Sequence, residues 1–148
     1  MANVFDVAVY ILRKQGFMTA MKLHKLLYYA QAWSLVWDDQ PLFPEEIQAW
    51  TNGPVAPRLY AVHKGRYKVD TVTFLGYGND RNLTALERDT INAVLAMYGK
   101  KSPEYLSALT HEEAPWRQAR KGLPEKARGD QVISLESMEQ YYAQMYQL

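Results

Sequence analysis

The longest hydrophobic stretch of the chain runs from Thr19 to Trp37 and is apolar on two sides when it is wound as a helix. One face carries side chains at the i, i+3, i+4, i+7 spacing of a buried helix: Leu23, Leu26, Leu27, Ala30, Trp33 and Trp37. The opposite side carries Met21, Tyr28, Tyr29, Ala32, Leu35 and Val36. A helix that is apolar on two sides usually lies between other elements, so this stretch is predicted to be the central helix of the core.

Helical periodicity and capping signals predict further helices on both sides of this stretch. A helix over 4–15 begins after Asn3 and ends before Gly16, and a helix over 85–98 follows the Thr84–Glu87 capping box. Ser102 and Pro103 begin a helix to about residue 110, residues 115–121 form a short one, and Ser134 caps the last. The predicted inward positions of the last two long helices are Leu86, Ile91, Val94, Leu95 and Tyr98, then Leu135, Met138, Tyr141, Tyr142 and Met145.

Extended structure is predicted only in short pieces. Residues 45–50 are ambiguous between a strand and a helical turn, and Asn52-Gly53-Pro54 is a turn signal before a short helix beginning at Pro57. Alternation and β-branched residues favour a strand over 69–75. No repeat or interdomain linker is present, so the fold class is mainly α: one compact domain over 1–148, a helical bundle around a buried central helix with at most a small β element.

Composition narrows the chemistry. The chain has no cysteine, which excludes disulfides and thiolate chemistry, and its net charge of +1 lacks the basic excess typical of nucleic-acid binding. Lys22, Lys25 and Gln31 interrupt the central stretch, so it is not expected to span a membrane. The N-terminus lacks the basic region and cleavage site of a signal peptide. A cytoplasmic protein is therefore expected.

The three histidines are the obvious candidates for catalysis or metal binding. His24 lies within the central helix, where a core or interface histidine with a satisfied hydrogen bond is expected; His63 lies near a helix end, where the dipole would favour its charge. His111-Glu112-Glu113 contains metal-ligand residue types, but neighbouring helical residues do not share a face and no second cluster exists. No nucleophile elbow, phosphate loop or carboxylate pair is present, so no catalytic residue, cofactor or metal is predicted, and the chain is not expected to be an enzyme.

A basic segment contains Arg117, Arg120, Lys121, Lys126 and Arg128, opposed only by Glu125 and Asp130. A solvated face is the first interpretation, an acidic protein partner the second and a phosphate backbone the third, since no aromatic residues are interleaved.

Three stretches together resemble a known family. They are KLHKLLYYAQAW over 22–33, PLF through IQAW to GPV over 41–55 with Pro57 and Tyr60, and LTHEEAPW over 109–116 with Tyr141-Tyr142 further on. In this order and spacing they resemble the Panacea domain of SocA-like antitoxins and phage-associated GepA-like proteins. The sequence departs from the commoner family pattern at Thr51-Asn52, where an aromatic residue often precedes the glycine.

The resemblance implies a bacterial, in some cases prophage-encoded, antitoxin that neutralises a toxin encoded nearby by direct protein–protein binding. The alternatives kept open are an adaptor that delivers the toxin to a cellular protease and, from another class, a nucleic-acid-binding regulator. A homodimer is also compatible with the many aromatic residues. Some family members carry an extra DNA-binding or other domain; in a chain of 148 residues no such domain, and no operon autoregulation by one, is expected.

The motif residues are expected to specify the fold more than the partner: Leu23, Lys25, Leu26, Tyr28, Trp33, Trp50, Gly53, Pro54, Tyr60, Thr110, His111, Pro115 and Trp116. The partner-binding surface is expected in the irregular 65–82 loop and in the basic segment. Tyrosine and arginine dominate interface hot spots, so its candidates are Tyr77, Arg117, Arg120, Lys121 and Arg128.

Overall fold

The computed structural model describes residues 1–147 and is mainly helical, as predicted. Leu148, the last residue of the predicted domain, lies outside this range. The helices are α1 (Val4–Gln15), α2 (Ala20–Asp38), α3 (Pro57–His63), α4 (Ala85–Tyr98), α5 (Pro103–Glu112), α6 (Ala114–Ala119) and α7 (Leu135–Gln147). The strands are β1 (Met18–Thr19), β2 (Gln48–Trp50), β3 (Gly53–Val55) and β4 (Lys68–Val69), and two 3-10 turns are η1 (Thr71–Phe74) and η2 (Asp80–Asn82).

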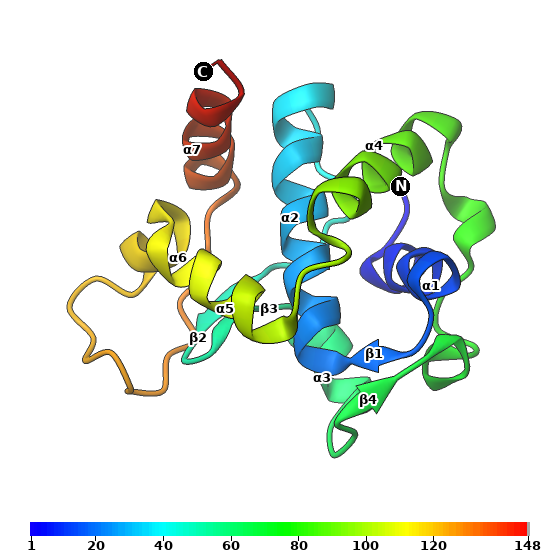
Figure 1. The fold of residues 1–148 in the computed structure, drawn as a ribbon, viewed down its shortest axis with the longest axis horizontal. Coiled ribbons are helices and arrows are strands. Elements are labelled where there is room, and N and C mark those ends of the chain that lie inside the picture. Colours follow the sequence, from blue (N-terminus) through cyan, green and yellow to red (C-terminus); the bar gives the residue numbers. More distant parts are fainter. Residues whose placement is uncertain (148) are drawn as a thin grey trace.

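Helix α2 stands at the centre of the fold, and α1, α4, α5 and α7 pack around it (Figure 1). Its apolar residues on both predicted faces, Leu23 to Ala32, are buried. Four of its polar residues, His24, Lys25, Gln31 and Ser34, are buried as well, and each has a hydrogen-bond partner. Gln31 accepts hydrogen bonds from the backbone of Leu42 and Phe43 and donates to the Phe43 carbonyl, so one amide holds the loop after α2 against the helix. A chain that buries the helix on all sides must satisfy these groups internally.

No helix within residues 1–147 is long and apolar enough to cross a membrane.

The predicted caps form. Asn3 and Asp6 bond reciprocally at the start of α1, and the free oxygen of Asp6 accepts from the Asn79 backbone at 2.7 Å. That second bond ties the irregular loop before α4 to α1. Thr84 and Glu87 form the predicted capping box of α4.

The β structure consists of two small antiparallel pairs, β1–β4 and β2–β3. The ambiguous 45–50 segment provides β2, whose other edge receives residues 131–133 through the bonds Ala49 N to Gln131 O and Ile133 N to Ile47 O. The chain therefore returns to the hairpin after α6.

The strand predicted over 69–75 is wrong beyond Val69. Asp70 accepts hydrogen bonds from the backbone of Val72 and Thr73, and Thr73 bonds back to Asp70 N. This reciprocal cap turns the chain into η1, because a side chain that satisfies nearby backbone donors competes with strand pairing.

Three predicted inward positions are also wrong: Leu86, Leu135 and Met145 are exposed. All three lie in a first or last turn of their helices. Periodicity identifies the face of a helix, but not how far the neighbouring elements extend along it.

Candidate functional site

A pocket of about 720 Å³ opens beside the N-terminal end of α2. Its walls come from α2, the β2–β3 hairpin, the C-terminal end of α3, the residues before β4 and residues 128–130. Figure 1 shows α3 and β4 at the lower end of α2, with the β2–β3 hairpin to one side. Two of the family-type motif stretches, 22–33 and 41–60, contribute to it, so residues distant in sequence converge on one cavity.

A buried histidine pair lies in the pocket wall. The Ala56 N–H donates to His24 Nδ1 at 3.1 Å, and the Nε2 atoms of His24 and His63 are 2.7 Å apart. Because His24 Nδ1 accepts, its proton is on Nε2, which donates to His63 Nε2. His63 then carries its proton on Nδ1, and this buried atom has no hydrogen-bond partner among the described residues.

Burial disfavours a positive charge on either histidine of the pair. Burial lowers the pKa of His24 well below its usual value, with the Lys25 charge adding to the effect, and burial also lowers the pKa of His63. The prediction of a satisfied core histidine at position 24 is confirmed. The prediction that the helix end would favour a charge on His63 is wrong, because desolvation outweighs the partial charge of a helix terminus.

Lys25 is buried beneath the hairpin with 1% of its surface exposed. Its Nζ donates to the Pro54 carbonyl at 3.2 Å, and burial lowers its pKa to about 7. The turn is shaped around this side chain: Gly53 has φ +126°, and a Cβ on Gly53 would lie 2.4 Å from Lys25 Cε. Only glycine leaves room for the lysine and adopts this backbone conformation.

Replacing Lys25 with methionine is expected to stabilise the domain near neutral pH. The unfolded lysine keeps a pKa near 10.5, so the folded state binds fewer protons between about pH 7 and pH 10 and stability rises with pH in that window. Lys25→Met removes this slope and gains roughly 3 kcal/mol at pH 7, after about 1 kcal/mol is subtracted for the hydrogen bond to Pro54. Chemical denaturation between pH 7 and 9.5 checks this; equal slopes for both proteins would contradict it.

The neighbours of Lys25 do not titrate in that window. His24 and His111 both have pKa values lowered by burial, with the Lys25 charge as a further cause. Both imidazoles are therefore neutral above pH 7.

Aromatic side chains and cations complete the pocket. Trp50 and Tyr60 meet edge to face with ring centres 4.9 Å apart, and Tyr67 lines the pocket with its side chain largely exposed. Arg66 and Arg128 also line it and are exposed.

The predicted basic surface is wrong at one position. Arg117, Lys121 and Arg128 are exposed, but Arg120 is buried. Its guanidinium lies over the Trp116 ring and donates to four backbone carbonyls, those of Ala49, Pro124, Glu125 and Ala127. Arg120 thus holds the loop that carries Arg128 and Asp130 against β2, and is not a residue that a partner could contact in this structure.

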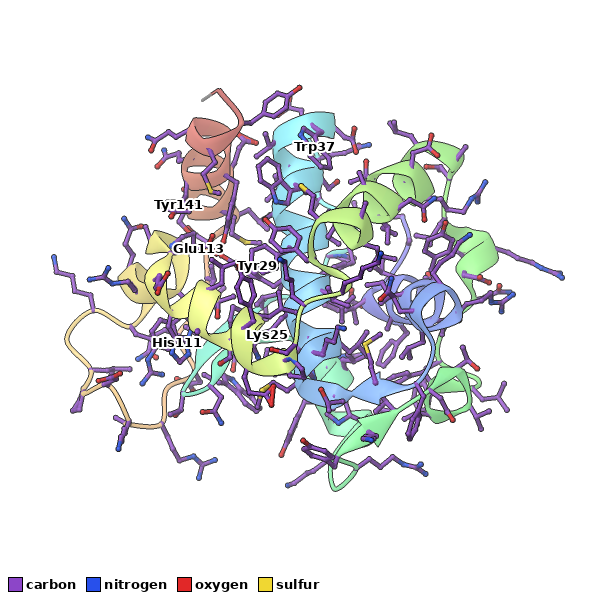
Figure 2. All side chains as sticks on the ribbon, viewed as in Figure 1. Lys25, Tyr29, Trp37, His111, Glu113 and Tyr141 are labelled. Atoms are coloured by element: carbon purple, nitrogen blue, oxygen red, sulfur yellow. The ribbon has the colours of Figure 1, made fainter. Side chains whose placement is uncertain are left out.

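A second buried polar network joins α2, α7 and the α5–α6 junction. Tyr29 Oη donates to Glu113 at 2.6 Å and Tyr142 Oη donates to the same carboxylate oxygen at 2.8 Å. Because Tyr142 uses its proton on Glu113, the bond between the Tyr28 and Tyr142 hydroxyls has Tyr28 as donor. Figure 2 shows Tyr29 reaching from α2 toward Glu113.

The sequence did not indicate that Glu113 is the shared acceptor of a buried hydrogen-bond network. Burial raises the pKa of Glu113, and the bonds from Tyr29 and Tyr142 partly oppose this. Its neighbours in the sequence face elsewhere. The His111 ring stacks on the Trp116 ring with ring centres 3.9 Å apart, and Glu112 is exposed. Within residues 1–147, no three His, Asp or Glu side chains converge as a metal site.

The motif residues are mostly inside the molecule. Trp33 and Trp116 are buried and their indole N–H groups donate to Tyr98 Oη and the Trp50 carbonyl. The other buried members are Leu23, Lys25, Leu26, Tyr28, Gly53, Pro54, Thr110 and Pro115, whereas Trp50, Tyr60 and His111 are half-buried.

Comparison with known proteins identifies the family. Residues 23–117 match the family model described as "Antitoxin SocA-like, Panacea domain". Comparison with curated proteins gives no significant match, and neither does comparison with solved structures. The match covers more than half of the chain and includes all of the motif positions named above. The chain therefore belongs to the SocA-like, Panacea-domain antitoxin family.

Proposed function

We propose that this domain neutralises a cognate toxin, encoded beside it in a bacterial or prophage genome, by binding the toxin directly in the cytoplasm. The observation that carries the proposal is the family match over residues 23–117. Two buried ionisable groups fit a structural role: Glu113 and Arg120 are occupied in holding elements together.

An exposed apolar surface supports a protein partner. Phe17, Tyr67, Val72, Leu75 and Tyr77 are each more than half exposed. They lie within or next to three adjoining elements, because β1 pairs with β4 and η1 follows β4 directly. Clustered apolar and aromatic side chains of this kind mark interaction sites. We call these five residues the apolar surface and propose that the toxin binds there; Tyr77 was among the residues predicted from the sequence.

The test is a growth assay in which the neighbouring open reading frame is expressed with and without this protein, followed by co-purification. Growth arrest that the protein relieves, with a stable complex, is the expected result. Within this assay, Leu75→Asp is expected to abolish rescue and complex formation. Leu86→Asp is the matched control, because Leu86 is also an exposed leucine but lies on α4, outside the apolar surface. A toxic neighbour that is never rescued, or equal effects of both variants, would overturn the proposal or its surface.

The same assay separates the alternatives. An adaptor for a protease lowers the amount of toxin in the cell, whereas an inhibitor leaves it unchanged or raises it. A nucleic-acid-binding regulator shows salt-dependent binding that weakens with Arg117→Gln; burial of Arg120 removes one cation from that surface.

A further inference from the structure

Two residues that line the pocket beside α2, His63 and Lys25, carry buried hydrogen-bond donors without a full set of acceptors among the described residues. The geometry of the histidine pair places a proton on His63 Nδ1, an atom that is buried and without a partner among residues 1–147. Lys25, 1% exposed, has one acceptor, the Pro54 carbonyl, for the three N–H groups of an ammonium. Buried donors normally find acceptors, so both groups have bonding capacity left for a ligand.

The rim of the pocket is positively charged. Arg66 and Arg128 line it, are exposed, and form no ion pair with the residues that the structure describes. Asp130 is the one acidic residue among the described pocket-lining residues. The two exposed arginines outnumber this carboxylate, and Lys25 adds a third positive charge at pH values below its pKa of about 7, so the balance of charge favours an anionic ligand.

The remaining wall is aromatic. Trp50 and Tyr60 are half-buried and fixed edge to face, while Tyr67 lies beside Arg66 at the opening. Planar ligands bind such walls by stacking. The volume of about 720 Å³ falls within the range of sites for small molecules.

We propose that this pocket binds a small ligand that combines a planar ring with an anionic group, of the nucleotide class. In this arrangement the ring lies against Trp50 and Tyr60, and the anionic group lies within reach of Arg66, Arg128 and Lys25. The inference does not rest on the antitoxin proposal, because it is argued from the lining of the cavity; Tyr67 is the one member of the apolar surface that also lines the pocket.

An acidic side chain of a protein partner shares the anionic chemistry and is distinguished by experiment. A free ligand binds the isolated protein, whereas an acidic side chain enters the pocket only within a complex.

The experiment is calorimetric titration of the purified full chain with AMP, ADP and GDP, with adenosine and inorganic phosphate as the two separate parts. Saturable binding of at least one nucleotide, about tenfold or more tighter than either part alone, is expected. Saturable nucleotide binding that is no tighter than the binding of inorganic phosphate would contradict the proposal that the pocket binds the ring. Absence of binding at millimolar nucleotide would overturn the whole proposal.

Variants locate the site. Arg128→Gln is expected to weaken nucleotide binding about tenfold, whereas Lys121→Gln, an exposed cation of the same segment that does not line the pocket, leaves it unchanged. Lys25→Met is a third variant that separates binding from folding, because it is expected to raise stability and to weaken binding. Equal effects of Arg128→Gln and Lys121→Gln, or unchanged binding in Lys25→Met, would place the ligand elsewhere and overturn the proposal.

Two further outcomes concern the partner. If no nucleotide binds and Lys25→Met abolishes the complex with the toxin, the pocket accepts a side chain of the partner and the small-ligand proposal is overturned. Nucleotide binding to a protein that rescues no toxin would overturn the antitoxin proposal alone.

Discussion

Replacing Arg120 with alanine is expected to lower the free energy of unfolding by about 4 kcal/mol, because one buried and three partly buried carbonyl groups lose a charged donor at once. The guanidinium donates to Ala49 in β2 and to Pro124, Glu125 and Ala127 in the following loop, the last at 2.6 Å. Its contact with the Trp116 ring is lost as well. Denaturation in urea, followed by tryptophan fluorescence, measures the effect.

Two neighbouring substitutions control this experiment. Arg117→Ala removes an exposed arginine three residues away and is expected to change stability by no more than about 0.5 kcal/mol. Arg120→Lys keeps the charge but not the planar fork of donors, so it should recover only a minor part of the loss. If Arg120→Ala lowered the free energy of unfolding as little as Arg117→Ala, the four carbonyls would be satisfied without the guanidinium, and Arg120 would not hold the loop against β2.

Replacing Glu113 with alanine is expected to cost about 3 kcal/mol, because two buried tyrosine hydroxyls lose their shared acceptor. Tyr29 and Tyr142 both donate to Glu113, and Tyr142 in turn accepts from Tyr28, so one substitution disturbs contacts among α2, α7 and the α5–α6 junction. Glu113→Gln keeps an acceptor oxygen in place and should retain much of the stability. Near-equal losses for alanine and glutamine would show that the hydroxyls do not depend on this acceptor.

The pH dependence gives a second readout for Glu113. Its pKa is raised in the folded state by burial, so the contribution of this group to stability is fully present below the unfolded value of about 4.5 and is lost as pH rises through the folded value. Tyr29, Tyr142 and Glu112 are the groups that act on it. Relative to Glu113→Gln, the wild-type protein should therefore lose stability as pH rises above 4.5. A constant difference between the two proteins would contradict the raised pKa.

Local sequence patterns predicted most of the helical framework. The caps Asn3, Thr84 and Ser102 each accept a hydrogen bond from the expected backbone N–H, because a cap depends on residues within one turn. The two-sided apolar pattern of α2 predicted its central position. The strand predicted beyond Val69 failed because Asp70 provides a competing local cap, which β-branched residues do not reveal.

The pocket and the buried polar residues could not be predicted from local sequence patterns, because they form only when distant segments come together. From the sequence, Arg120 was predicted to be part of a charged surface. In the fold, the chain returns to β2 and places backbone carbonyls around the guanidinium. In the sequence, Glu113 is one of two adjacent acidic residues, and nothing there indicates that α7 places Tyr142 against it. The family motif indicated that Lys25 and Gly53 mattered, but only the fold shows that the glycine leaves space for the lysine.

The position of α7 in the core has a consequence for synthesis of the protein. Met138 and Tyr142 are fully buried against the rest of the fold, and residues 131–133 extend β2. Domains fold as units while the ribosome proceeds from the N-terminus. Until residue 142 has been synthesised, the central helix of the nascent chain therefore lacks the cover of α7 on one side. A product truncated before that point exposes Tyr28, Tyr29 and Trp33, which chaperones and proteases can then bind.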